Sequence, residues 1–382
     1  MSKIRVLTLT HEYPPVGGGG GRVAQDIAEG LANRGFEVWV LTAHYGDLPT
    51  RQDGDVTVRR IHSGRTQPFR AGIRAMLGYV IGAVIQGYSI IRRWKPDILH
   101  VHFAVPAGAA AWLLHLLTGV PYMLTVHLGD VPGGVPEKTS GWFRWVYPFT
   151  PLIWRKAARV VAVSEFTRRL AKKHYDVPID VVYNGVDLKA MDPGVISVNR
   201  PPQVVFAGRF VEQKNPLQVV RTLAGLQHLD WKCVMLGDGP LRPLVEKEIA
   251  VNHLQDRFRL PGWVTPEEVL NYFRESDILF LPSRSEGLPV VGVQACALGL
   301  ALVLSRAGGC IDLVEENRNG FLVEQDDGEG FRNALSLLLS SPGVLQGYRR
   351  ASRGVADKFD LEKVIESYSR MIENILRDKT GT

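Results

Sequence analysis

The chain has 382 residues, of which 45% are hydrophobic and 22% are charged, and its formal net charge is +6 at pH 7. This length is too great for one ordinary hydrophobic core and suits two domains of roughly 150–200 residues, and the composition excludes a disordered chain. The basic excess suits phosphate ligands or an anionic membrane surface, whereas the absence of zinc-finger spacing, RNP-type aromatics and a basic arm predicts no nucleic-acid partner.

Residues 1–187 alternate apolar β-rich runs with helical stretches, which is the pattern of a parallel sheet with crossover helices. The first run begins at once, without the layout of a signal peptide, and the three cysteines form no Cys-X-X-Cys pair, so we expect a protein of the reducing cytoplasm. The strands expected in this domain are Ile4–Thr10, Glu37–Thr42, Val56–His62, Asp97–His102, Tyr122–His127, Arg159–Val163 and Asp180–Tyr183.

Residues 75–91 carry no charge over seventeen positions, which is at the short edge of a membrane span. The segment contains three glycines and lies between two expected strands, so a buried crossover helix is the favoured interpretation. Aromatic and basic residues at 142–147, with Lys138 close by, add to the basic residues around this segment. Such a mixture suits a bilayer interface, and we expect peripheral membrane binding by this domain; the alternative is that the aromatics line a substrate pocket or pack in the core. The basic residues around 75–91 are Arg65, Arg70, Arg74, Arg92, Arg93 and Lys95.

The alternation stops at residues 188–202, which contain Asp-Pro-Gly and Pro-Pro without hydrophobic periodicity, so we expect an interdomain linker there. It restarts in residues 203–358, and a final helix capped by Asp360 is expected within residues 359–382. The strands expected in the second domain are Gln203–Ala207, Lys232–Leu236, Arg257–Leu260, Asp277–Leu281 and Ala301–Leu304.

Five consecutive glycines, residues 17–21, connect the first strand to the first helix. Because they lack Cβ atoms, their amides can approach a ligand closely, and the N-terminus of the following helix favours anions. The layout therefore suits a phosphate, and a flexible turn without a ligand is the alternative. The spacing matches neither the Gly-X-Gly-X-X-Gly pattern, because Arg22 takes the place of its third glycine, nor the Walker lysine motif.

Polar side chains also follow later strands. His127 stands at the carboxyl end of its strand, the end that faces the ligand crevice in open α/β sheets, although a purely structural histidine is the alternative. Arg209 and Lys214 lie five positions apart after the first strand of the second domain. A guanidinium fork and a flexible ammonium suit a diphosphate, and an ordinary solvated basic loop is the alternative.

The segment SRSEGLPVVGVQACALG places Glu286 just before a helix that begins near Pro289, where the helix dipole favours a carboxylate and free amides can meet a ligand. Gln294 lies about two helical turns further on. Gly-X-Ser-X-Gly and His-Glu-X-X-His motifs are absent, and the Asp-Gly-Asp string at 53–55 is interpreted as a surface turn, so we expect no metal. A hydrolase with paired carboxylates is not supported, because no second acidic residue has a comparable placement.

Taken together, these segments resemble the retaining glycosyltransferases of family 4, which have the GT-B fold of two Rossmann-like domains that face each other across a cleft. The resemblance runs nearly from end to end. The first-domain motifs are EYPPVGGGGGRVAQDIAEGLANRGFEVWVLT, PDILHVHF, TVHLGD, VVAVSEFTRRL and VVYNGVDL; the second-domain motifs are FAGRFVEQKN, VMLGDGPLRPLVE, LPSRSEGLPVVGVQACALG and AGGCIDLVEENRNGFLV. It implies an acceptor-side first domain, a nucleotide-sugar donor-binding second domain, and a last helix that packs back on the first domain.

The resemblance also implies roles for single residues. His127 would bind a hydroxyl of the donor sugar, Arg209 and Lys214 would clamp the diphosphate, and Glu286 would hold the transferred sugar. Gln294 departs from the family pattern, in which a glutamate binds the ribose, and Asp312 stands where a glutamate is commoner. The donor-binding positions implied are Gly17, Gly18, Gly262, Trp263, Gly287, Leu288, Pro289, Val290 and Gln294.

The activity implied is retaining transfer of a hexose-type sugar from a nucleoside-diphosphate sugar, UDP before GDP, to a hydroxyl of a carbohydrate, lipid-linked or small-molecule acceptor. We expect no metal or other cofactor, and a role in cell-envelope polysaccharide or glycolipid synthesis in the cytoplasm, at the inner face of the membrane. Two alternatives stay open: a nucleotide-sugar 2-epimerase of the same fold, and a non-catalytic sugar-nucleotide-binding subunit, which Gln294 favours.

Overall fold

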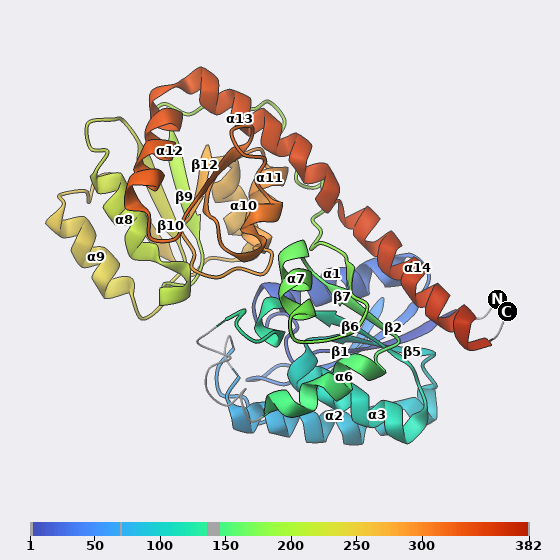
Figure 1. The fold of residues 1–382 in the computed structure, drawn as a ribbon. Helices are drawn as coiled ribbons and strands as arrows, with labels where there is room; N and C mark the ends of the chain where they lie inside the picture. Colours follow the sequence, from blue (N-terminus) through green and yellow to red (C-terminus); the bar gives the residue numbers. More distant parts are fainter. Residues whose placement is uncertain (1–2, 69–70, 136–145, 381–382) are drawn as a thin grey trace. The chain divides into compact units, whose positions relative to one another are not determined.

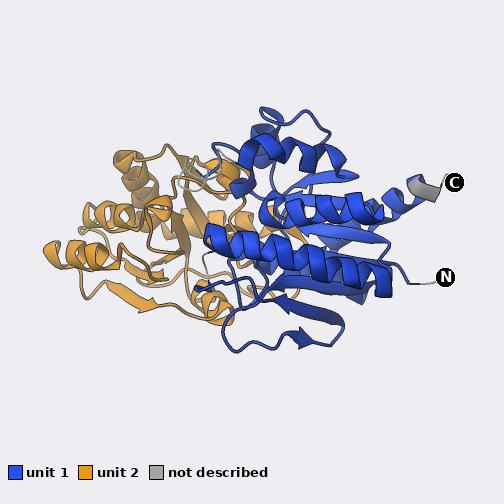
Figure 2. Ribbon diagram, turned by 90° about the horizontal axis from the view of Figure 1, so that it is seen from below, with its two compact units in different colours: residues 1–185, 361–382 blue, residues 186–360 orange. Residues whose placement is uncertain are grey.

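The computed structural model describes residues 3–68, 71–135 and 146–380, which form two compact units (Figure 1, Figure 2). The first unit combines residues 1–185 with residues 361–382, and the second contains residues 186–360. Each is built on a parallel sheet with helices, as expected for two Rossmann-like domains. Residues 188–202, predicted to be a linker, belong to the second unit by their contacts.

The first unit contains an eight-stranded sheet in the order β3-β4-β2-β1-β5-β6-β7-β8, parallel except for the pairing of β3 with β4. Its central strands are buried on both faces, which is why most of their residues are apolar. The two-residue strand β3 is exposed, and its sequence gave no strand signal. The strands are β1 (Arg5–Leu9), β2 (Glu37–Ala43), β3 (Arg51–Gln52), β4 (Val56–Ile61), β5 (Ile98–His102), β6 (Tyr122–Val126), β7 (Arg159–Ala162) and β8 (Asp180–Val181).

Helices of the first unit pack in two groups, with α2, α3 and α6 in contact on one face of the sheet and α1 with α14 on the other (Figure 1). The C-terminal helix thus packs on the first unit, as the resemblance implied. Gly30 permits this contact, because a Cβ there would lie 2.4 Å from Cγ1 of Ile365. The helices are α1 (Gly19–Asn33), α2 (Ile73–Trp94), α3 (Ala109–Thr118), α6 (Thr150–Lys156), α7 (Glu165–Lys172) and α14 (Leu361–Thr380).

The uncharged segment 75–91 lies in α2, which crosses over between β4 and β5 as predicted. One stripe of α2 enters the core, where the Tyr79 hydroxyl donates to the Leu41 carbonyl oxygen at 2.9 Å. The helix is long and apolar enough to cross a membrane by length and composition, yet only 28% of its most apolar window is buried. The prediction of a buried helix is therefore wrong for the outward face, which is exposed and apolar.

The basic residues predicted to meet a membrane divide into different groups. Arg65 is buried, and its guanidinium donates to the carbonyl oxygens of His11, Gln67 and Pro68 at 2.9–3.0 Å. It therefore braces the loop after β4, and its assignment to a membrane surface is wrong. Some of the residues predicted to meet a membrane lie outside the described part of the chain: Arg70, Lys138 and residues 142–145.

The second unit contains a six-stranded, entirely parallel sheet in the order β11-β10-β9-β12-β13-β14. The sequence did not predict β14, which is short and only partly buried. The strands are β9 (Gln203–Ala207), β10 (Lys232–Leu236), β11 (Phe258–Gly262), β12 (Ile278–Leu281), β13 (Ala301–Ser305) and β14 (Gly320–Val323). The helices are α8 (Pro216–Ala224), α9 (Arg242–Val251), α10 (Pro266–Arg274), α11 (Val290–Ala297), α12 (Gly328–Ser340) and α13 (Pro342–Val355).

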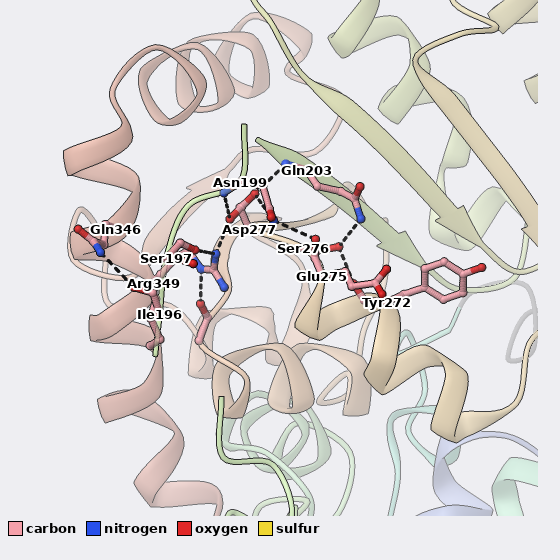
Figure 3. A network of polar contacts seen from close by, with 11 residues as sticks. Ile196, Ser197, Asn199, Gln203, Tyr272, Glu275, Ser276, Asp277, Gln346 and Arg349 are labelled. Carbon is pink, nitrogen blue, oxygen red and sulfur yellow. Dashed lines mark hydrogen bonds and ion pairs between the residues drawn. The ribbon is translucent and has the colours of Figure 1, made fainter. Parts of the chain in front are cut away.

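A buried polar network joins residues 196–203 to this sheet (Figure 3). The Asp277 carboxylate, fully buried at the start of β12, pairs with the Arg349 guanidinium of α13. It also accepts hydrogen bonds from the amide and side chain of Asn199 at 3.2 and 2.9 Å and from the Gln203 amide at 2.8 Å. Arg349 donates to the carbonyl oxygens of Ser197 and Gly299 as well. These bonds explain why the apparent linker is an ordered part of the second unit.

Two buried histidines lie side by side in β5, His100 and His102, with ring centroids 4.5 Å apart. His100 Nε2 lies 3.0 Å from the Thr125 hydroxyl, whereas neither ring nitrogen of His102 has a hydrogen-bond partner within the described residues. Burial lowers the pKa of His100 to about 3, and burial together with the neighbouring histidines lowers the pKa of His102 well below its ordinary value. Both imidazoles are therefore neutral in the folded protein.

These lowered pKa values predict that the first unit loses stability in mild acid. Below the unfolded-state pKa of about 6.5, the unfolded chain binds protons that folded His100 and His102 do not, so stability falls as pH falls by up to about 1.4 kcal/mol per pH unit for each histidine. Urea unfolding followed by circular dichroism, at pH values above and below about 6.5, measures the effect. His102→Gln is expected to remove about half of the pH dependence that the two histidines cause. The matched change His228→Gln, at an exposed position of the second unit, is expected to leave the dependence unchanged; equal dependence in wild type and His102→Gln would contradict the assignment.

Candidate functional site

The carboxyl ends of the parallel strands gather most of the predicted site residues within each unit, as is general for open α/β sheets. In the first unit, His127 follows β6 and is half-buried. Its ring stacks on that of Phe103, which follows β5, at a centroid distance of 4.4 Å. Gly20, at the start of α1, completes the group, because a Cβ there would lie 2.5 Å from Phe103 and 3.5 Å from His127. The glycine-rich loop and His127 are therefore neighbours.

The amides of Gly17 and Gly18, predicted to meet the donor diphosphate, are bonded to protein acceptors in this structure. The Gly17 amide donates to the Pro68 carbonyl oxygen at 2.8 Å, and the Gly18 amide donates to the Glu12 carboxylate at 3.0 Å. A carboxylate thus occupies the anion position before α1, which has no side-chain cap. This location supports the expected preference for an anion there, with Glu12 as its present occupant.

Asp130 is a site residue that the sequence reasoning missed. Its buried carboxylate accepts hydrogen bonds from the His127 amide at 2.8 Å and from the Ala104 amide at 2.9 Å. It therefore joins the loop after β5 to the loop after β6 and fixes the backbone that carries His127. The spacing of three residues from His127 is that of a capping box and could have indicated this role.

Phe103 was missed as well, and its backbone is unusual. Its φ of 74° lies in the left-handed region, which costs a residue with a Cβ atom on the order of 1 kcal/mol or more. The residue persists there because its ring is held between His11, at a centroid distance of 4.7 Å, and His127. Such strain is concentrated at functional sites, which supports a function for this end of the sheet.

In the second unit, two of the three charged residues predicted after β9 and β12 form an ion pair. Lys214 Nζ donates to Glu286 Oε1 at 2.6 Å, and the two side chains are 17% and 6% exposed. Lys214 belongs to a short 3-10 turn after β9, and Glu286 lies in the loop between β12 and α11. Removal of either partner would leave an uncompensated charge at a largely buried position, so each side chain depends on the other.

Two hydrogen bonds to backbone carbonyl oxygens hold the two loops together beside this pair. The Arg284 amide donates to the Gln213 carbonyl oxygen at 2.8 Å, and the Gln213 side chain donates to the Ser285 carbonyl oxygen at 3.0 Å. The positions of Lys214 and Glu286 are therefore set by the loops that carry them, not by their own bond alone.

Two glycines after β13 pack directly against the Glu286 loop. A Cβ on Gly308 would lie 1.7 Å from the Glu286 carbonyl oxygen, and a Cβ on Gly309 would lie 1.6 Å from the Gly287 carbonyl oxygen. The Gly309 amide donates to the Glu286 carbonyl oxygen at 3.0 Å. No residue with a side chain fits either position without moving the loop, so the Gly-Gly pair is a structural requirement of the site.

Arg209 follows β9 in the same region and is half-buried. Its side chain makes no hydrogen bond or ion pair with any residue that the structure describes. The backbone around it is fixed by Gly237, whose φ is 126° and whose Cβ would lie 2.0 Å from the Gly208 carbonyl oxygen. Lys214 packs over Gly208, at 3.5 Å from the position of a Cβ there, so both cations lie beside Gly208. A half-buried guanidinium without a counter-charge suits an anionic ligand.

The remaining donor-binding positions lie at neighbouring strand ends. Gly262 ends β11 with a φ of 83°, and Trp263 is 53% exposed beside it. Gln294 is half-buried on α11, with no side-chain bond to any described residue. The first turn of α11 begins after Gly287, Leu288 and Pro289, and its N-cap Pro289 has no side-chain cap bond, so amides near Val290 are available to a ligand.

No group of three or more His, Cys, Asp or Glu side chains in the described residues could hold a metal ion. Asp53, in the Asp-Gly-Asp string, lies in an exposed turn and pairs with Arg51 at 2.8 Å.

Comparison with known families identifies the two units. Residues 17–190 match the description "Glycosyltransferase Family 4", and residues 192–355 match "Glycosyl transferases group 1". N-acetyl-alpha-D-glucosaminyl L-malate synthase of Bacillus anthracis is 24% identical over 389 residues, which cover 96% of each chain.

Solved structures are similar over nearly the whole chain. Sucrose-phosphate synthase of Thermosynechococcus elongatus has a TM-score of 0.86 at 18% identity and covers 98% of this chain and 100% of its own. The HepE protein of Anabaena, solved in complex with UDP and glucose, has a TM-score of 0.77 at 17% identity and covers 97% and 99%. With both family matches in order along the chain and two Rossmann-like domains in the structure, this protein belongs to glycosyltransferase family 4 and is a glycosyltransferase of the GT-B fold.

Proposed function

We propose that the protein transfers a hexose-type sugar from a nucleoside-diphosphate sugar, UDP before GDP, to a hydroxyl of an acceptor, with retention of the anomeric configuration and without a metal ion. The observation that carries the proposal is the group of three charges in the second unit: the Lys214–Glu286 pair, with Arg209 beside it and free of a counter-charge in the described residues. Two cations and one carboxylate suit a ligand that carries a diphosphate next to sugar hydroxyls.

In the proposed reaction, the bond between the sugar and the diphosphate breaks and negative charge develops on the leaving diphosphate. Arg209 and Lys214 stabilise that charge, and they are held in place before the reaction, which is the main electrostatic contribution that an enzyme can make. Lys214 uses one N–H on Glu286, so two remain for phosphate oxygens. Glu286 accepts hydrogen bonds from hydroxyls of the transferred sugar.

Retention follows in this proposal from attack on the same face that the diphosphate leaves. The acceptor oxygen forms the new bond to the anomeric carbon, and the departing diphosphate takes the acceptor's proton, so that no covalent enzyme intermediate is needed. His127 orients the sugar through a hydroxyl, supported by Asp130 and Phe103. Catalysis is then positioning together with charge stabilisation.

Two relatives support the choice of substrates. The complex of HepE with UDP and glucose supports UDP as the nucleotide and a hexose as the sugar. The name of the Bacillus relative describes transfer to malate, which supports a hydroxyl acceptor that can be a small molecule as well as a carbohydrate or a lipid-linked sugar. We place the reaction in the cytoplasm, at the inner face of the membrane, in the synthesis of cell-envelope polysaccharide or glycolipid.

The test is a panel of UDP-, GDP- and ADP-sugars, first for binding and then for turnover. A donor that binds the folded protein raises its melting temperature, which selects the base and the sugar. Nucleotide release that requires an acceptor, with EDTA present and an α-linked product from an α-linked donor, is the expected result. Release of an epimerised free sugar without an acceptor would replace the proposal by a 2-epimerase, and binding without any turnover would replace it by a binding subunit.

Loss of either cation is expected to abolish most turnover. Arg209→Ala and Lys214→Ala each remove a donor to the departing diphosphate, and such a loss typically lowers the rate by ~10²-fold or more. Initial rates with the selected donor measure the effect, and circular dichroism checks the fold. Lys247→Ala, at an exposed lysine of the same unit, is the matched control and is expected to keep the wild-type rate. Near-normal rates in either site variant would remove that cation from the mechanism.

The positions Glu286 and Gln294 are expected to respond in opposite ways. Glu286→Gln replaces a charged acceptor by a neutral one at the transferred sugar, so we expect transfer to be crippled. Gln294→Glu restores the residue common in the family and is expected to be tolerated and to tighten donor binding by about 1 kcal/mol, because a charged acceptor binds hydroxyls more strongly. Separate measurement of kcat and KM decides both cases. An inactive Gln294→Glu variant would show that the glutamine has a role of its own.

A further inference from the structure

The outward face of α2 exposes a regular apolar stripe. Ile73, Leu77, Ile81 and Ile85 follow each other at intervals of four residues and are 57%, 59%, 54% and 66% exposed, and Tyr88 continues the same side. Residues four apart lie one above the other on a helix, so these side chains form one continuous strip along most of the helix. The opposite stripe, with Tyr79 and its neighbours, is packed in the core.

Neighbouring helices widen this strip into a surface. α2 contacts α3, and α3 contacts α6, on the face of the first sheet that Figure 2 views from below. Leu116 and Leu117 at the end of α3 are 55% and 60% exposed, and Phe149 and Leu152 at the start of α6 are 65% and 43% exposed. We call the nine exposed residues on these elements the outer helix face: Ile73, Leu77, Ile81, Ile85, Tyr88, Leu116, Leu117, Phe149 and Leu152.

This clustering is particular to the outer helix face. Within the described residues, every large apolar side chain of the first unit that is exposed belongs to it. The six such side chains of the second unit are distributed over several elements: Val195, Leu244, Val251, Trp263, Leu337 and Val344. Single exposed apolar residues need no explanation, whereas a contiguous apolar surface marks a place where another surface binds.

The charges around the outer helix face have one sign. Residues 71–95, 103–122 and 146–158, which carry α2, α3 and α6, contain no Asp or Glu. Six exposed cations lie on or just after α2 and α6, and none of them makes an ion pair with a described residue. These cations are Arg74, Arg92, Arg93, Lys95, Arg155 and Lys156.

We propose that the outer helix face is the surface by which this protein docks on an anionic lipid bilayer. The helix α2 lies flat in the interface, with the apolar stripe among the upper acyl chains and the cations among the phosphates, as is usual for interfacial helices. It does not cross the bilayer, because its other stripe belongs to the core of the first unit. At 1.5 Å per residue, its 22 residues give a contact roughly 33 Å long.

The alternative occupant, a second copy of this chain, is disfavoured by charge. A face-to-face dimer through this surface would bring the unpaired cations of both copies together with no carboxylate on these helices to offset them. An anionic membrane provides the opposite charge and an apolar layer at the same time. The inference deepens the membrane location given under the proposed function by naming the surface that binds, and its test depends on neither the donor nor the acceptor.

The test is flotation of the purified full-length protein with phosphatidylcholine vesicles, with and without phosphatidylglycerol. Wild type is expected to float with anionic vesicles at low salt and much less with neutral ones. The triple variant Leu77→Gln, Ile81→Gln, Ile85→Gln removes three exposed apolar contacts and is expected to lower vesicle binding at least ~10-fold. Because these side chains face outward, circular dichroism and the melting temperature are expected to stay unchanged.

The matched control is the variant Leu244→Gln, Val251→Gln on α9, which removes apolar side chains of similar exposure from the second unit. It is expected to bind vesicles like wild type. Arg92→Gln with Arg93→Gln is expected to weaken binding to anionic vesicles on the order of fivefold for each cation and to reduce the dependence on salt, because each Arg near the surface adds about that factor.

Three results would overturn the proposal: wild type that stays soluble with anionic vesicles at low salt, equal flotation of wild type and the triple variant, or a dimer in sedimentation equilibrium that the triple variant dissociates. Donor binding, measured by thermal shift on the same samples, keeps the two proposals apart. If the triple variant binds UDP-sugar normally and fails to float, the membrane proposal is supported. That result does not depend on whether the protein transfers sugar.

Discussion

The second unit depends on one buried ion pair. Asp277 has no exposed surface, and its two oxygens accept bonds from Arg349, Asn199 and Gln203, so that α13, the entering segment and the first strand are all fixed to the start of β12 (Figure 3). Loss of one partner of such a pair typically costs about 3–5 kcal/mol, since the other charge stays buried. Because β9 and β12 are adjacent and carry Lys214 and Glu286 at their other ends, this pair at the amino end aligns the strands that deliver the charged site residues.

Each unit has its own parallel sheet, and the side chains at the carboxyl ends of the strands differ in kind between the two units. In the first, His100, His102 and His127 lie close together, and burial keeps the first two neutral. In the second, Lys214 and Glu286 are also nearly buried, yet each supplies the counter-charge of the other. The difference follows from pairing: burial without an opposite charge lowers the pKa of the two histidines, whereas the ammonium and the carboxylate of the second unit are buried together as a pair.

The parallel strands were predictable from the sequence because a strand covered on both faces must be a run of apolar residues. Glu37–Ala43 and Gln203–Ala207 are examples, whereas the exposed Arg51–Gln52 carries no such signal. Individual site residues could be predicted from their positions at strand ends. Their hydrogen-bond partners could not, because Lys214 and Glu286 are 72 positions apart in the sequence. The hydrogen bond from the Gly18 amide to the Glu12 carboxylate depends on the conformation of a loop, which the sequence pattern does not specify. The exposure of the outward face of α2 depends on the tertiary packing, because no neighbouring element covers that face in the described residues.

The packing of α14 on α1 makes the first unit discontinuous in sequence, and this affects the order in which the units can form. Residues 186–360 emerge from the ribosome before Leu361–Thr380, so the second unit has all of its chain outside first, although it comes later in sequence than most of the first unit. Until the last helix emerges, Ile365, Tyr368 and Ile372 are missing from the first unit, and the α1 surface they cover is open to water. During synthesis, the first unit therefore starts before the second unit and receives its last helix after the second unit has its whole chain.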